Sequence, residues 1–143
     1  REDYMALVTP NQGELELLNK MLKAALSVDE NYILKLFQNN VTLDQTFVPA
    51  SFVEANFTTY AAKTLTRSGW NSAVTVSGAA TSSYGANPQS WTCGTSGNTI
   101  YGYWVEGATS GICLWAEKFT SARILADGDV LNLTPQFNLN SAN

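Results

Sequence analysis

The sequence contains no histidine among its 143 residues. Between Arg67 and Glu106, 38 consecutive residues carry no charged side chain, although they include three tryptophans and three tyrosines. Catalysis by proton transfer needs a group that titrates near neutral pH, most often histidine, or a carboxylate or lysine held in a pocket. Because this quarter of the chain offers none, the sequence points away from an enzyme and toward binding, assembly or architecture.

Charge is scarce over the whole chain. Charged residues make up 14% of the sequence, below the roughly 25% of an average soluble protein. The eight Lys and Arg residues are scattered and the formal net charge is -4, whereas binding to phosphates needs clustered Lys or Arg. We therefore expect no nucleic-acid partner. Ser, Thr and Asn provide an uncharged polar surface instead, which suits broad protein contacts.

Long apolar runs are also missing. No segment approaches the 18 or more apolar residues that a membrane helix requires, so we expect no membrane partner. The Leu- and Ala-rich stretch from Leu15 to Leu26 is interrupted by Glu16, Lys20 and Lys23 at helical spacing, which is not the pattern of an export signal. The length of the chain fits a single domain with its own core.

Cysteine is limited to Cys93 and Cys113. If residues 112–119 fold back on residues 100–106, Cys113 lies opposite about Trp104 and Cys93 lies near Ile100. The two α-carbons are then farther apart than the roughly 7 Å limit for a disulfide, which favours two buried thiols over a bridge. Two cysteines without histidine cannot complete a tetrahedral zinc site.

The apolar spacing at the start of the chain predicts one helix, from residue 11 or 12 to about residue 26. Leu15, Leu18 and Leu22 recur at steps of three and four, and Leu17 and Met21 widen the same face. We expect this face to pack within the domain, and contact with another subunit is the alternative.

Residues 1–12 precede the helix as a short extended arm. Its apolar residues Tyr4, Met5, Leu7 and Val8 are expected to be exposed and to dock on a neighbouring molecule. A frayed terminus is the alternative, because terminal residues are usually disordered unless they are tied down. Residues 12–143, including the helix, form the single domain.

After residue 31 the apolar period changes to two, which predicts strands. Residues 77–88 read as one long loop, and Ser51 with Glu54 resembles a capping box that opens a single helical turn. No connection after residue 60 has the helical pattern of a strand-helix-strand crossover, so parallel topology is disfavoured. The predicted strands span residues 32–37, 46–48, 60–66, 70–76, 89–93, 99–106, 112–119 and 130–139.

These elements predict a mainly β fold. One N-terminal α-helix and about seven to eight short strands with turn residues between them indicate an antiparallel β-sandwich or jelly roll.

The acidic residues give little support for a metal or catalytic site. Asp127-Gly128-Asp129 has too few oxygen ligands for calcium, and Asp-Gly is a hairpin turn signal. Glu106 and Glu117 fall on strands that we expect to be neighbours and are a conceivable glycosidase pair. A solvated ion pair at a strand end is favoured for Glu117, which Lys118 follows. We predict no catalytic residue, no metal and no cofactor.

Tyr101 and Tyr103 share one face of their predicted strand if the strand is regular, which predicts an exposed tyrosine stripe. Such a stripe suits a protein interface or a glycan platform. Together with Tyr4, Met5, Leu7 and Val8 of the arm, these tyrosines are the predicted partner-binding residues.

Several strings occur in a recognisable order. They are Leu34-Lys35-Leu36-Phe37, Asn39-Asn40-Val41-Thr42, Phe52-x-Glu54-Ala55-x-Phe57-x-x-Tyr60-Ala61-Ala62-Lys63-Thr64-Leu65, Tyr101-Gly102-Tyr103-x-Val105, Leu114-Trp115-Ala116-Glu117-x-Phe119 and Gly128-Asp129-x-Leu131-x-Leu133-Thr134-Pro135-x-Phe137. In this order, over roughly residues 15–139, they resemble small structural proteins of tailed-bacteriophage virions.

The resemblance implies a non-enzymatic virion component that is assembled in the cytoplasm of the bacterial host. A capsid cement or decoration protein, which binds several subunits of the major capsid protein or another virion protein, is the first interpretation. A homo-oligomer such as a trimer would match the local symmetry of a shell. The alternatives are a head or tail fibre or baseplate protein that contacts the host surface, and a secreted sugar-binding lectin.

Overall fold

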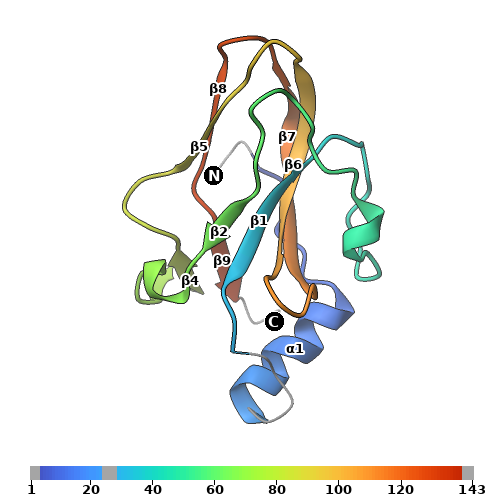
Figure 1. Ribbon diagram of the computed structural model, residues 1–143. Helices are drawn as coiled ribbons and strands as arrows, with labels where there is room; N and C mark the ends of the chain where they lie inside the picture. Colours follow the sequence, from blue (N-terminus) through green and yellow to red (C-terminus); the bar gives the residue numbers. More distant parts are fainter. Residues whose placement is uncertain (1–3, 24–28, 140–143) are drawn as a thin grey trace.

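The computed structural model describes residues 4–23 and 29–139 (Figure 1). In these ranges one α-helix precedes nine β-strands, and two single 3₁₀ turns, Pro49–Ser51 and Arg67–Gly69, lie between strands. The bounds are α1 Asn11–Leu22, β1 Tyr32–Phe37, β2 Lys63–Leu65, β3 Val74–Val76, β4 Ala79–Ser83, β5 Gln89–Thr92, β6 Asn98–Gly107, β7 Cys113–Leu125, β8 Val130–Leu133 and β9 Gln136–Leu139.

The strands form one large and two small antiparallel sheets. The large sheet has the order β2-β1-β6-β7, and the small sheets have the orders β3-β4-β9 and β5-β8. Leu34, Tyr103 and Trp115 of the large sheet share one buried core with Trp91 and Leu133 of the β5-β8 sheet. The small sheets thus cover one face of the large one, which confirms the predicted mainly β, antiparallel sandwich with one N-terminal helix.

A second cluster covers the opposite face of the large sheet. The segment between β1 and β2 folds over this face and places Phe47 and Phe52 against Phe37 and Trp104. The rings of Phe52 and Trp104 are stacked with centroids 4.8 Å apart, and those of Phe37 and Phe52 with centroids 4.9 Å apart. Burial on both faces explains why β1 reads as a nearly continuous apolar run.

The two cysteines are free and buried, as predicted. The register assumed for them was wrong in detail, because Cys113 lies opposite Glu106 and Trp104 lies opposite Ala116. Irregularities in the β6-β7 ladder shift the pairing.

The predicted loop over residues 77–88 is instead largely a hairpin. Ser77 and Gly78 both have positive φ, 49° and 83°, and join β3 to β4 in a two-residue turn of the kind that suits the twist of a hairpin. The small residues Ala and Ser in β4 carry a weak strand signal, which is why the sequence pattern missed it.

Other element predictions also differ from the structure. The predicted strands 60–66 and 70–76 are strands only over Lys63–Leu65 and Val74–Val76, and β7 extends to Leu125, beyond the predicted end at residue 119. Residues 46–48 are not a strand, because Thr46 belongs to a turn at residues 45–46 and residues 47–48 have no regular structure. The single helical turn ends at Ser51 instead of beginning there. Residues 130–139 are two strands, because β8 ends before the Thr134-Pro135 break and β9 begins after it. Proline has no N–H to donate to a ladder, so it ends the strand.

The helix begins at Asn11, within the predicted range, and ends at Leu22. Residues 24–26, which the prediction also assigned to it, lie outside the described residues.

The described part of the N-terminal arm lies along the outer edge of β7. Val8 exchanges two backbone hydrogen bonds of 3.0 Å with Ala116, and Met5 donates its N–H to the carbonyl of Lys118 at 2.8 Å. Tyr4 forms an antiparallel bridge with Phe119. The arm therefore satisfies backbone groups of its own domain at an edge that would otherwise be open.

Candidate association surface at helix α1

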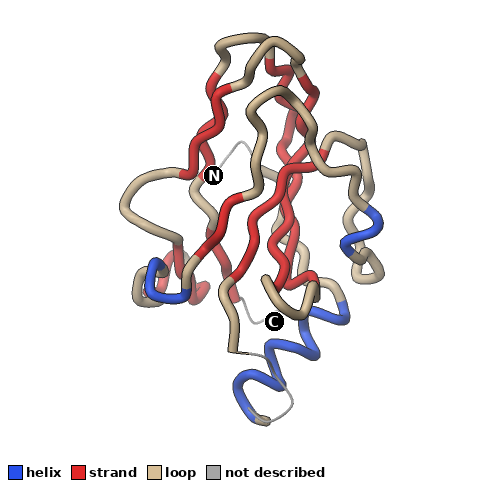
Figure 2. Tube along the Cα trace, viewed as in Figure 1, coloured by secondary structure: helices blue, strands red, loops and turns tan. Residues whose placement is uncertain are grey.

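Helix α1 lies at one end of the sandwich, outside the stacked sheets (Figure 2). Its buried residues are Gly13 and Glu16. The predicted packing of its apolar face within the domain is wrong, because that face points to solvent. The exposed fractions are 64% for Leu15, 50% for Leu18, 73% for Met21 and 70% for Leu22.

A glycine sets the contact between α1 and the large sheet. A Cβ atom at Gly13 would lie 2.5 Å from the carbonyl oxygen of Leu114 and 2.8 Å from that of Cys113. The helix backbone thus rests directly on the backbone of β7, which is possible only without a side chain at this position.

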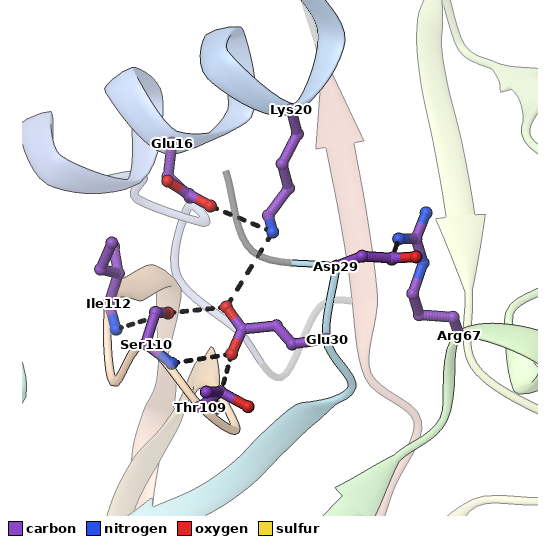
Figure 3. Close-up of polar contacts among 8 residues, drawn as sticks. All are labelled: Glu16, Lys20, Asp29, Glu30, Arg67, Thr109, Ser110 and Ile112. Carbon is purple, nitrogen blue, oxygen red and sulfur yellow. Dashed lines mark hydrogen bonds and ion pairs between the residues drawn. The ribbon is translucent and has the colours of Figure 1, made fainter. Parts of the chain in front are cut away.

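A polar cluster, the latch, whose two carboxylates Glu16 and Glu30 are buried, holds the inner side of α1 (Figure 3). It consists of Glu16, Lys20, Glu30, Thr109 and Ser110. Nζ of Lys20 lies 3.0 Å from Oε1 of Glu16 and 3.9 Å from Oε1 of Glu30. Oε1 of Glu16 has no hydrogen-bond partner among the described residues, so its contact with Lys20 is an ion pair without hydrogen-bond geometry.

Glu30 joins the latch to the turn between β6 and β7. Its Oε2 accepts hydrogen bonds from the backbone N–H groups of Thr109 at 2.5 Å and Ser110 at 2.8 Å, and its Oε1 accepts one from the Ser110 hydroxyl at 2.7 Å. Beside the latch, Asp29 and Arg67 form an ion pair whose side chains are largely exposed. The latch fixes α1 to the segment before β1 and to the end of the large sheet.

The electrostatics keep Glu30 charged. Burial by itself raises the pKa of this carboxyl, but the hydrogen bonds from Ser110 and Thr109 and the nearby charge of Lys20 outweigh it, so the pKa is lowered. Buried charges persist in a fold only when they are paired and hydrogen-bonded. The polar side of α1 is thus held inward, and the apolar side is left outside as a consequence.

A groove of about 990 Å³ runs beside α1. Its apolar walls come from Leu7 of the arm, from Leu17, Leu18 and Met21 of the helix, and from Leu139 at the end of β9. The exposed face of α1 and this groove together form what we call the α1 surface. It is a largely apolar region that side chains of the described residues leave uncovered, and its polar lining residues are Thr9, Glu14, Lys20 and Asn138.

The hairpin β3-β4 provides a second uncovered surface. All residues from 71 to 78 are exposed, including Val74 and Val76, and β3 is the outer strand of its sheet. This hairpin lies inside the uncharged stretch of the sequence. Natural sheets usually protect an exposed edge with charge or proline, and residues 71–78 contain neither.

The predicted partner-binding residues of the arm are mostly turned toward their own domain. Tyr4, Leu7 and Val8 are half-buried and pack against the two cores, and Met5 is the exposed one of the four. The ring of Tyr4 meets that of Tyr103 edge-on at 6.5 Å.

The predicted exposed tyrosine stripe does not exist. The β6-β7 register shifts between Ile100 and Gly102, and this bulge places Tyr101 and Tyr103 on opposite faces of the sheet. Tyr103 is fully buried and donates its hydroxyl to Oε2 of Glu117 at 2.5 Å, whereas Tyr101 is half-buried against the other cluster.

The two carboxylates considered as a glycosidase pair are separated by the sheet. Glu106 accepts a hydrogen bond from Nε1 of Trp104 at 2.7 Å and lies 2.8 Å from Nζ of Lys35. Glu117 is buried with Tyr103 on the other face, so its predicted position at a solvated strand end is wrong. Two carboxyl groups on opposite faces cannot flank one glycosidic bond.

The segment Asp127-Gly128-Asp129 is a turn, as predicted. Oδ2 of Asp129 accepts the N–H of Ala126 at 2.8 Å, and Gly128 has a φ of 85°. Within residues 4–23 and 29–139, no three His, Cys, Asp or Glu side chains are grouped closely enough to hold a metal ion.

Comparison with models of known protein families and with curated proteins gives no match for this chain. None of the helices in the described part of the chain is long and apolar enough to cross a membrane. The functional argument therefore rests on the residues of the chain itself.

Proposed function

We propose that this protein is a non-enzymatic structural component of a tailed-phage virion and acts as a capsid cement or decoration protein. The ordered strings that resemble phage structural proteins support the virion role. The observation that carries the association role is the orientation of α1, whose polar side is latched inward and whose four large apolar residues face solvent. Contiguous exposed apolar surface of this kind marks a site of association.

A cement protein has to join at least two partners, and the chain has two surfaces suited to this. The α1 surface is apolar, and the hairpin surface over residues 71–78 is uncharged with two exposed valines. Each contact is modest in area, but simultaneous contacts raise the overall affinity strongly.

Three carboxylates that are engaged within the fold support the same proposal. Glu30 is committed to the latch, Glu106 to Lys35 and Trp104, and Glu117 to Tyr103. A cement protein needs no reactive group, because it stabilises the shell by burying surface against the capsid subunits.

The test is reconstitution with phage capsids that lack the protein. Purified protein is mixed with these capsids, and co-sedimentation is measured together with the temperature at which the capsids rupture. We expect saturable binding and a higher rupture temperature. Absence of saturable binding to any such capsid refutes the cement role.

Variants locate the contact with the shell. The double substitution V74D/V76D places charge on the hairpin and is expected to weaken capsid binding at least tenfold. Ile124→Asp is the matched control, because Ile124 is an exposed apolar residue on β7 outside both surfaces. Equal binding by the hairpin variant and the control removes the hairpin from the contact.

A further inference from the structure

We propose that the α1 surface binds the α1 surface of a second copy of this chain, so that the protein reaches the shell as a twofold dimer that presents two hairpins. The inference rests on the association role proposed above, but it assigns α1 to self-association and leaves the hairpin for the shell.

The α1 surface contains a ridge and a groove, which lie on opposite sides of Leu18. Successive residues of an α-helix are rotated by about 100°. Relative to Leu18, Leu15 and Leu22 therefore lie roughly 40–60° to one side, and Met21 and Leu17 lie roughly 60–100° to the other. The first pair forms an exposed ridge, and the second pair lines the groove.

Ridge and groove on one surface are complementary to a second copy of the same surface. A twofold axis parallel to α1 places the ridge of each copy over the groove of the other, with the Leu18 side chains meeting at the axis. Such an isologous contact needs no partner of different shape. Any other occupant has to supply both features itself.

The charges at the surface make this pairing weak. The ridge residues are apolar, and Lys20, which lies at the groove, is already paired with Glu16 and Glu30. Glu14 is exposed and lines the groove about 40° from Leu18, so the pairing brings this carboxylate beside the ridge of the second copy. Its partial desolvation and the net charge of -4 on each copy oppose association, whereas the apolar contacts favour it.

The size of the contact sets the expected strength. A helix of 12 residues is about 18 Å long, so the interface lies at the small end of the range for specific complexes. We expect a dimer that dissociates on dilution.

The first experiment is sedimentation equilibrium of the free protein from about 1 to about 200 μM, which spans dissociation constants typical of weak dimers. We expect a monomer-dimer equilibrium for the natural chain and for the Ile124→Asp control. Leu15→Asp and Leu22→Asp are expected to weaken dimerisation by at least tenfold, and an unchanged circular dichroism spectrum shows that they fold. A monomer at every concentration, or a trimer, overturns the inference.

A cysteine placed on the axis gives an independent readout. Both native cysteines are buried, so Leu18→Cys adds an accessible thiol that meets its symmetry mate. We expect oxidation to give a covalent dimer for Leu18→Cys and none for Ile124→Cys. Equal cross-linking of the two variants contradicts the twofold contact.

Capsid binding of the same variants separates this inference from the proposed function. Dimerisation without capsid binding refutes the cement role and supports the inference. If the natural chain is monomeric and Leu22→Asp abolishes capsid binding, the α1 surface contacts the shell directly, and the inference fails while the proposed function stands.

Discussion

Replacement of Glu30 by glutamine tests whether the latch holds α1 in its outward orientation. The substitution keeps the shape of the side chain and removes its charge. The carbonyl oxygen of glutamine can still accept the two backbone N–H groups of Thr109 and Ser110. Its NH₂ group replaces the oxygen that accepts the Ser110 hydroxyl and then faces the ammonium of Lys20. The variant therefore loses charge assistance in the hydrogen bonds and gains an unfavourable contact.

The magnitude follows from the contacts. A hydrogen bond to a charged group contributes about 1.5–3 kcal/mol and a neutral one about 0.5–1.5 kcal/mol, so two bonds lose roughly 2–3 kcal/mol. Removal of one partner from a buried ion pair costs about 3–5 kcal/mol, and Lys20 keeps Glu16 as a second partner, which reduces this cost. We expect a decrease of about 2–4 kcal/mol in the free energy of unfolding, or roughly 6–14 °C in Tm.

The assay is urea denaturation followed by tryptophan fluorescence, with a matched control. Glu54→Gln removes a partly exposed carboxylate that lies 3.6 Å from Lys35 and accepts the Tyr60 hydroxyl at 3.0 Å. One hydrogen bond loses charge assistance, so the cost is expected at about 1–1.5 kcal/mol, below that of Glu30→Gln. Hydrogen exchange gives the local readout, because a weakened latch exposes the amides of α1 more often than those of β6. Equal destabilisation by the two variants, with unchanged exchange in α1, refutes the assigned role of the latch.

The pH dependence of this difference has a definite sign. The folded-state pKa of Glu30 lies below its usual value of 4.5. Its contribution to stability is therefore fully present above about pH 4.5 and is lost as the pH falls through the folded pKa. The stability gap between the natural chain and Glu30→Gln should be constant from pH 6 to pH 8 and should shrink below pH 4.5.

Three other substitutions or modifications have defined outcomes. Gly13→Ala drives a methyl group into carbonyls of β7 and should destabilise the fold by about 1–3 kcal/mol in urea denaturation, and a neutral effect contradicts the close contact. Tyr103→Phe removes the hydroxyl donor of buried Glu117 and should cost about 1–3 kcal/mol by the same measurement, whereas a cost below 0.5 kcal/mol argues against the assigned hydrogen bond. Because burial raises the pKa of the Cys113 thiol and Cys93 is also buried, both should react with a thiol reagent only after unfolding, and rapid labelling of the native protein contradicts this.

Which face of α1 points toward the domain could not be predicted from the sequence. The spacing of Leu15, Leu18 and Leu22 identified the helix and its apolar face. It could not identify which side faces the domain, because that depends on Gly13 against β7 and on a latch between residues far apart in the sequence. The Glu16 and Lys20 pair at i and i+4 was visible, but its burial with Glu30 arises only in the folded chain.

The strands show the same division between local and long-range information. β1, β5 and β6 follow their sequence patterns within one or two residues. The tyrosine stripe failed because a bulge after Ile100 reverses the alternation, and a bulge is set by the partner strand. By contrast, the end of β8 is visible in the sequence, because Pro135 cannot donate an N–H to a ladder and therefore indicates a break between β8 and β9.

The position of the N-terminal arm has a consequence for the order in which the chain folds. Tyr4 and Val8 are synthesised before their partners Phe119 and Ala116, which lie more than 100 residues further along the chain. Contacts between such distant residues form slowly because the intervening chain has to be closed first. During synthesis the arm therefore has no partner until residues 113–125 have emerged. During refolding the edge of β7 stays open until the arm has closed over it, and aggregation should decrease at that point.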